Sequence, residues 1–131
     1  MIFLDTSAIY AWTDTRDLNH HAAVQLLQEI VNRQEQLLTH NYLVLEAFTI
    51  LQARLGLSAA TKFAQDCQAF EIEWVDKDLH DSGIRQLQKS AKRRVSLVDH
   101  ISFLVMTRRN LTTAFAFDPH FKAEGFRLFE P

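Results

Sequence analysis

The sequence predicts an α/β domain built on a mostly parallel sheet. Short runs of strand-forming residues alternate with longer segments of helical periodicity, and this alternation is typical of a parallel sheet covered by helices. The length of 131 residues fits one domain. Only 3 Gly and 2 Pro occur, too few for a linker or a low-complexity segment. Residues 1–131 are therefore expected to form a single domain.

Strands are expected where a short apolar or β-branched run ends at a polar residue or a turn. The run IFLD opens the chain and ends at Asp5, and the run TTAFAF stops just before Asp118. A third run, EIEWV, alternates between polar and apolar residues, as a half-buried strand does. The expected strands cover residues 2–5, 36–40, 71–75, 112–117 and, as a last edge strand, 127–130.

Helices are expected between these strands because apolar residues recur three and four positions apart. The expected helices cover residues 6–12, 17–35, 41–56, about 59–69, 78–92 and 96–109. Residues suited to N-caps stand at several of these starts: Thr6 or Ser7, Asn41, Ser58 and Ser96. Gly56 has the place of a residue that ends a helix, and Gly83 weakens the prediction of the helix that contains it.

Two aspartates, Asp5 and Asp118, follow expected strands directly. In open parallel sheets, ligands bind outside the carboxyl ends of the strands, so the two carboxylates can meet at one edge. Each also has a purely structural explanation. Asp-Thr-Ser suits the start of a helix, and Asp-Pro commonly starts a turn.

Two further carboxylates, Glu46 and Asp99, lie on expected helices among apolar residues. Most neighbours on the helical face of Glu46 are large and apolar, and a buried carboxylate is costly unless it is paired or binds a metal. A salt bridge to Arg54 or to a distant Lys is the alternative. Asp99 forms a capping box with Ser96, which is compatible with a second role because a first-turn Asp is exposed at the helix end.

Taken together, the four carboxylates indicate a divalent cation. Four acids in one place repel one another, and a cation removes that penalty. Oxygen ligands favour Mg²⁺ or Mn²⁺, and such ions assist phosphodiester hydrolysis by activating water and stabilising charge on phosphate oxygens. Leaving these four out of the 16 acids gives 12, against 14 Lys and Arg, so the rest of the chain is slightly basic.

Residues 82–98 form a basic segment without any acid. Its positive side chains are Arg85, Lys89, Lys92, Arg93 and Arg94. If the segment is helical, several of them share one face. The segment is either a solvated helix end, where basic residues suit the dipole, or an electrostatic footprint for an anionic polymer. In the second case Lys92, Arg93 and Arg94 are the expected phosphate contacts.

Other features exclude several classes of protein. The single Cys67 excludes an internal disulfide and suggests packing. The sequence leads us to expect no signal peptide, no membrane-spanning segment and no Gly-rich phosphate loop, and the expected location is the cytoplasm. His100 is expected to point away from Asp99, and His120 to pack or to form a hydrogen bond. Tyr10 or Trp12 is a candidate for stacking on an RNA base.

Three stretches resemble the PIN-domain family, and more narrowly its VapC-like branch of small bacterial proteins. They are FLDTSAIYAW, NYLVLEAFTILQARLG and SLVDHISFLVMTRRNLTTAFAFDPHF, the last followed by Gly-Phe. The resemblance implies a three-layer α/β/α fold with a parallel sheet of about five strands. It also implies a Mg²⁺- or Mn²⁺-dependent ribonuclease with a pocket formed by Asp5, Glu46, Asp99 and Asp118, of which Asp5, Asp99 and Asp118 hold the metal.

The same resemblance implies partners and supporting residues. Many such proteins are homodimeric toxins held inactive by a small antitoxin protein. Ser7 and Ser102 match polar positions near the acids and are expected to orient waters. One position departs from the pattern, because Ala116 stands where relatives often carry Thr or Ser. That departure leaves open a catalytically weak module that binds RNA or an antitoxin without cutting.

Overall fold

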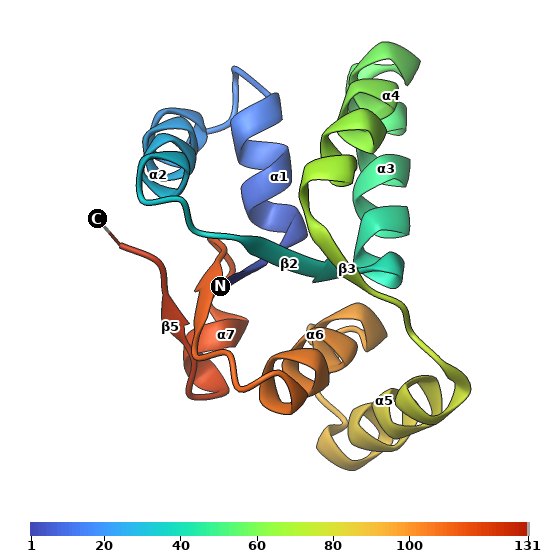
Figure 1. The fold of residues 1–131 in the computed structure, drawn as a ribbon. Helices are drawn as coiled ribbons and strands as arrows, with labels where there is room; N and C mark the ends of the chain where they lie inside the picture. The colour runs from blue at the N-terminus through green and yellow to red at the C-terminus, as the bar shows by residue number, and fades with distance from the viewer. Residues whose placement is uncertain (131) are drawn as a thin grey trace.

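A five-stranded parallel sheet forms the middle layer of the computed structural model, which describes residues 1–130 (Figure 1). The strand order is β3-β2-β1-β4-β5, with every neighbouring pair parallel. The strands are β1 (Ile2–Leu4), β2 (Leu37–His40), β3 (Glu71–Glu73), β4 (Thr113–Phe115) and β5 (Arg127–Leu128). The predicted fold class is confirmed, and the last strand does lie at an edge of the sheet.

Helices cover both faces of the sheet, so the fold has three layers. Figure 1 shows α1 to α4 above the sheet and α5 to α7 below it. The helices are α1 (Thr6–Thr13), α2 (His20–Asn32), α3 (Asn41–Leu55), α4 (Leu57–Asp66), α5 (Lys77–Ser90), α6 (Leu97–Arg108) and α7 (His120–Ala123), with a short 3₁₀ turn at Cys67–Ala69. Within residues 1–130, none of these helices combines the length and the apolarity needed to cross a bilayer.

The central strands β1 and β4 bring the N- and C-terminal parts of the chain together. Phe3 pairs with Leu38 on one side and with Ala114 on the other. These three side chains are fully buried, as expected for a parallel sheet covered on both faces. Because β1 and β4 are neighbours and parallel, the residues that follow them emerge at the same edge.

Several helix starts differ from the prediction. The N-cap of α1 is Asp5 rather than Thr6 or Ser7, and its carboxylate accepts a hydrogen bond from Ser7 N. His40, not Asn41, caps α3: its Nδ1 accepts from the Leu43 N–H at 3.1 Å. Helix α4 begins directly after Gly56, so Ser58 is not its cap. The capping box of Ser96 and Asp99 is confirmed.

The basic segment does not form one helical face. Helix α5 ends at Ser90, and Ala91 adopts a left-handed backbone conformation with φ 52°. Lys92, Arg93 and Arg94 therefore lie in the exposed connection to α6. The expected helix over 78–92 is wrong in its last turn, because the residue after Ser90 turns the chain out of the helix.

Gly83, which weakened the helix prediction, lies at the contact between α5 and α6. A Cβ at this position would overlap Ile101 Cδ1 and would also lie 3.2 Å from Leu97 Cδ1. Ile101 is fully buried. With Ile101 in this position, glycine fits residue 83 without a shift of α6, and α6 carries Asp99 at its start.

We expect Gly83→Ala to destabilise the protein by up to about 2 kcal/mol, because overpacking costs roughly 1–3 kcal/mol and the gain in helix propensity offsets about 1 kcal/mol of it. In the Ile101→Val background, where the overlapping methyl group is absent, the cost should fall by at least half. Urea unfolding of the four proteins measures both values. An equal cost in the two backgrounds would show that Ile101 is not the obstacle.

Candidate active site

The four predicted carboxylates line one cavity. Asp5 follows β1, Asp118 follows β4, Asp99 lies in the first turn of α6, and Glu46 lies in the second turn of α3. All four contribute to a cavity of about 590 Å³. The prediction that the aspartates after β1 and β4 meet at one edge is confirmed, and the two helical acids reach the same space.

Ser7 joins the two strand ends. Its hydroxyl donates to Asp5 Oδ2 at 2.6 Å, and its backbone N–H donates to the same oxygen at 3.0 Å. The Ser7 hydroxyl also accepts from Phe117 N at 2.9 Å. The two hydrogen bonds to Asp5 Oδ2 hold the Asp5 carboxylate in one orientation. The hydrogen bond from Phe117 N fixes the loop after β4 next to that carboxylate.

Asp5 and Glu46 both resist ionisation. Asp5 is only 5% exposed, and above all this burial raises the pKa of its carboxyl to about 6. The negative charges of Asp99 and Asp118 act in the same direction, and the hydrogen bonds from Ser7 act against them. Burial also raises the pKa of the Glu46 carboxyl, again with the charges of Asp99 and Asp118. Within residues 1–130, Glu46 has no basic partner within salt-bridge distance, so the alternative pairing with Arg54 is absent.

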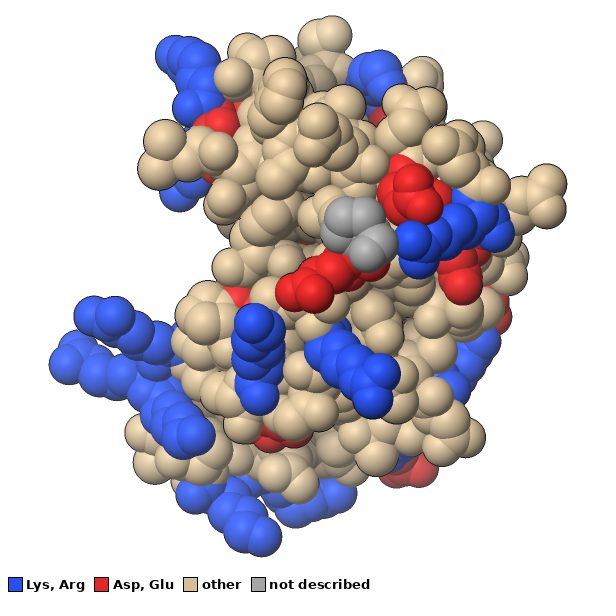
Figure 2. Space-filling model, turned by 90° about the vertical axis from the view of Figure 1, so that its left-hand side faces the viewer, with Lys and Arg blue, Asp and Glu red and all other residues tan. Residues whose placement is uncertain are grey.

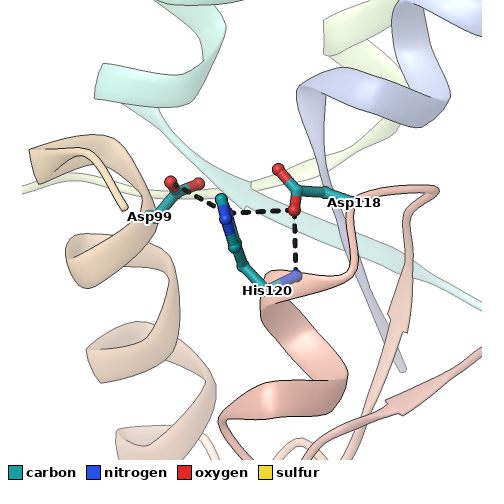
Figure 3. Close-up of side chains that lie close together, drawn as sticks. All are labelled: Asp99, Asp118 and His120. Atoms are coloured by element: carbon teal, nitrogen blue, oxygen red, sulfur yellow. Dashed lines mark hydrogen bonds and ion pairs between the residues drawn. The ribbon is translucent and has the colours of Figure 1, made fainter. Parts of the chain in front are cut away.

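Asp99, on α6, points toward Asp118 and His120, which lie together on the turn that leads from β4 into α7 (Figure 3). His120 Nδ1 lies 3.0 Å from Asp118 Oδ1 and 3.7 Å from Asp99 Oδ2. One candidate ligand atom from each residue lies within 4.8 Å of the other two. Sequence reasoning placed His120 beside the site but expected it to pack or to form a hydrogen bond.

The chemistry of the cavity fits a divalent cation. Four carboxylates supply the hard oxygen atoms that Mg²⁺ and Mn²⁺ prefer. Two buried polar atoms on its wall form no hydrogen bond of good geometry among the described residues: Thr6 Oγ1, which faces the Glu46 carboxylate, and His120 Nδ1, which lies 3.0 Å from Asp118 Oδ1. Thr6 is only 9% exposed, and buried polar atoms are rarely left without a partner. Both atoms have a natural explanation if a cation and its waters complete the site.

Ser102 does not take part in this cavity. It is fully buried, and its hydroxyl donates to Val98 O and accepts from His40 Nε2, both at 2.9 Å. Since His40 Nδ1 accepts from Leu43 N, the proton of the ring is on Nε2. Burial lowers the pKa of His40 to about 3 and keeps it neutral. The expectation that Ser102 orients waters beside the acids is thus corrected: Ser102 connects α6 to the start of α3.

Basic residues stand around the acids. Arg54 and Arg94 line the same cavity, and neither is in an ion pair among residues 1–130. Lys92, Arg93 and Arg94 also line an adjacent hollow of about 340 Å³ that shares His120 with the cavity. In Figure 2, Lys and Arg side chains gather on the lower half of the molecule, at the height of α5 to α7 in Figure 1.

Of the two candidates for stacking on an RNA base, one lies in the cavity wall and the other in the core. Tyr10 lines the cavity, donates to Asp14 Oδ2 at 2.6 Å, and has the Arg54 guanidinium 5.2 Å from its ring centre. Trp12 instead packs against Phe115. His100 and Cys67 lie away from the cavity. The ring of His100 forms a hydrogen bond with the Ser90 hydroxyl, and burial raises the pKa of the Cys67 thiol to about 11.

The raised pKa of Asp5 predicts a pH-dependent stability of the metal-free protein. The folded carboxyl, with a pKa of about 6, holds its proton more tightly than the unfolded one at 3.8. The contribution of Asp5 is therefore complete below about pH 4 and is lost as the pH rises to about 6, with a loss on the order of 2–3 kcal/mol. Asp5→Asn removes this loss because the amide stays neutral.

Urea unfolding in EDTA between pH 4 and 7.5 measures the difference. The stability of Asp5→Asn relative to the unmodified protein should rise across this range. Asp78→Asn removes an exposed carboxylate on α5 and is the control for exchanging an aspartate for an asparagine elsewhere in the protein. A difference between Asp5→Asn and the unmodified protein that does not vary with pH would contradict the raised pKa.

Known proteins resemble this chain in sequence and in overall fold. Two curated relatives, from the CDC 1551/Oshkosh and H37Rv strains of Mycobacterium tuberculosis, are both named 23S rRNA-specific endonuclease VapC20. Each is 33% identical over 128 residues, covering 96% of this chain and 95% of its own length. The crystal structure of Mycobacterium tuberculosis VapC20, described as a sarcin–ricin loop cleaving toxin, superimposes with a TM-score of 0.90 at 32% identity over the whole of both chains.

The family model agrees with these relatives and covers nearly the whole chain. The model of the PIN domain matches residues 2–126, a range that contains all four carboxylates of the cavity. The three-layer fold expected from the resemblance is also the one observed. This chain belongs to the PIN-domain family.

Proposed function

We propose that this protein is a metal-dependent endoribonuclease that hydrolyses RNA phosphodiester bonds. The observation that carries the proposal is the convergence of Asp5, Glu46, Asp99 and Asp118, from four separate segments, on one cavity. The names of the relatives support it, since VapC20 is a 23S rRNA-specific endonuclease. The expected ion is Mg²⁺ or Mn²⁺, with Asp5, Asp99 and Asp118 as its ligands.

A bound divalent cation supplies charge to stabilise the phosphate oxygens and to lower the pKa of an attacking water. The residues of the chain supply the rest. Glu46 has a raised pKa, so its carboxylate is suited to accept a proton from that water near neutral pH. Ser7 orients the Asp5 carboxylate through two hydrogen bonds, and the capping box fixes Asp99. The cavity wall thereby holds its carboxylates in place before substrate arrives.

Basic residues beside the cavity account for RNA binding in this proposal. Arg94 and Arg54 lie on its wall, where their guanidinium groups can hold the phosphates that flank the cut. Lys92 and Arg93 extend the positive surface along the adjacent hollow. A phosphate chain crossing from this hollow to the cavity would pass His120, which lines both.

The comparisons support a more specific role as the toxin of a toxin–antitoxin pair. VapC20 is described as a toxin that cleaves the sarcin–ricin loop, and we propose ribosomal RNA of this kind as the substrate class. Such a toxin would act in the cytoplasm, as a homodimer, and would be held inactive by a small antitoxin. Exposed apolar side chains, among them Leu45, Leu57 and Trp74, are available for such protein contacts.

Cleavage of ribosomal RNA by the purified, partner-free protein tests this function. We expect cutting with Mg²⁺ or Mn²⁺, none with EDTA, and a loss of at least 100-fold in rate for Asp99→Asn, because the charge at the end of α6 is removed without a change in shape. His21→Gln, on the exposed side of α2, is the control that keeps full activity.

The alternative function is RNA or antitoxin binding without cleavage, which the buried Ala116 favours because no hydroxyl stands there to hold a metal-bound water. If the folded, metal-loaded protein binds ribosomal RNA and leaves it intact, the nuclease proposal is wrong and this alternative is right. Equal cleavage by Asp99→Asn would remove Asp99 from the reaction.

A further inference from the structure

We propose that His120 is a nitrogen ligand of the divalent cation, bound through Nδ1 beside Asp99 and Asp118. The inference rests on the metal-dependent function proposed above and refines it. An all-carboxylate site would have only oxygen ligands from side chains. A site with one imidazole has a different preference among metals, and that preference can be measured without any RNA.

The first argument is the position of the atom. His120 Nδ1 is buried and faces two carboxylate oxygens, at 3.0 Å from Asp118 Oδ1 and 3.7 Å from Asp99 Oδ2. Figure 3 shows the imidazole ring between the two carboxylates. Three ligand atoms from three side chains, all within 4.8 Å of one another, are spaced so that one ion can contact each of them after small side-chain rotations.

The second argument is that the contacts of Nδ1 are the two carboxylates themselves. Although it is close to Asp118, it forms no hydrogen bond within residues 1–130. The other histidines near the core use their ring nitrogens: His40 bonds Leu43 N and Ser102, His80 bonds Tyr42, and His100 bonds Ser90. The two carboxylates that face Nδ1 are also acids of the proposed metal site, so an ion bound between the three side chains would contact all of them at once.

The third argument is that the backbone holds His120 in place. Asp118 Oδ1 accepts a hydrogen bond from His120 N at 2.9 Å, and Pro119 between them restricts the chain. Helix α7 begins at His120 and anchors it through Phe121, which is fully buried. The two residues are therefore presented as a unit, with a carboxylate and an imidazole on the same side of one turn.

An imidazole ligand changes which ions bind well. Mg²⁺ demands oxygen ligands and keeps several waters, whereas imidazole suits transition-metal ions, whose affinity for nitrogen rises from Mn²⁺ to Co²⁺ and beyond. We therefore expect the site to bind Mn²⁺ and Co²⁺ more tightly than Mg²⁺. Replacing His120 should remove most of this preference, while the carboxylates continue to bind Mg²⁺.

Electron spin-echo spectroscopy of the Mn²⁺-loaded protein, without RNA, is the direct test. A ¹⁴N modulation from a coordinated imidazole should be present in the unmodified protein and in His21→Gln, the matched surface control, and absent in His120→Gln. Calorimetric titration of the same proteins should show Mn²⁺ binding weakened roughly tenfold or more in His120→Gln, with Mg²⁺ binding changed less than about twofold.

The outcomes separate this inference from the function on which it rests. In one outcome, the unmodified protein binds Mn²⁺ tightly, Asp99→Asn loses this binding, and the spectrum shows no ¹⁴N modulation. The carboxylate metal site would then stand, and the role of His120 as a ligand would be overturned. Equal weakening of Mn²⁺ and Mg²⁺ in His120→Gln would also overturn it, because the histidine would then act on the shape of the site and not as a ligand. If the unmodified protein binds neither ion, the proposed metal-dependent function fails as well.

Discussion

The mutual repulsion of four carboxylates is the constraint on which this structure depends. Asp5, Glu46, Asp99 and Asp118 come from four segments and line one cavity, where the charges of Asp99 and Asp118 disfavour the ionisation of Asp5 and Glu46. The fold brings them together because β1 and β4 are adjacent and parallel. The pKa values of the Asp5 and Glu46 carboxyls are raised, above all by burial and further by the charges of Asp99 and Asp118.

Local structure holds the acids in place against this repulsion. Asp5 caps α1 and accepts two hydrogen bonds from Ser7, Asp99 completes a capping box, and Asp118 accepts from the backbone of His120. Each of these interactions is also the structural explanation that the sequence offered for that acid. The structural and functional explanations are therefore not rivals at this site, because an acid used as a cap is an acid whose direction is fixed.

The fold class and the meeting of the four acids in one place could be predicted from the sequence, because the patterns that indicate them are local. Apolar runs that end in Asp identify strand ends, and the spacing of Ser96 and Asp99 identifies a capping box. Long-range contacts were not accessible in the same way. Ser102 is committed to His40, which is 62 positions away, and Gly83 is required by Ile101 on another helix. No local pattern reveals such partners.

His120 shows the same limit at the site itself. Its sequence position, two residues after Asp118, indicates that it is near the cavity, but the burial of Nδ1 between Asp99 and Asp118 depends on the placement of α6 and α7. Likewise, the basic segment was recognised from its composition, whereas the left-handed Ala91 that ends α5 moved Lys92, Arg93 and Arg94 from a helical face to a loop beside the cavity.

Thermal unfolding with increasing Mn²⁺ at neutral pH tests most directly the claim that the four carboxylates form one cation site. A ligand present at about 100 times its dissociation constant stabilises the folded state by roughly 2.7 kcal/mol, so the midpoint temperature should rise by several degrees. Asp118→Asn should lose most of this rise. A midpoint that does not respond to Mn²⁺, or that rises equally in Asp118→Asn, would contradict the account.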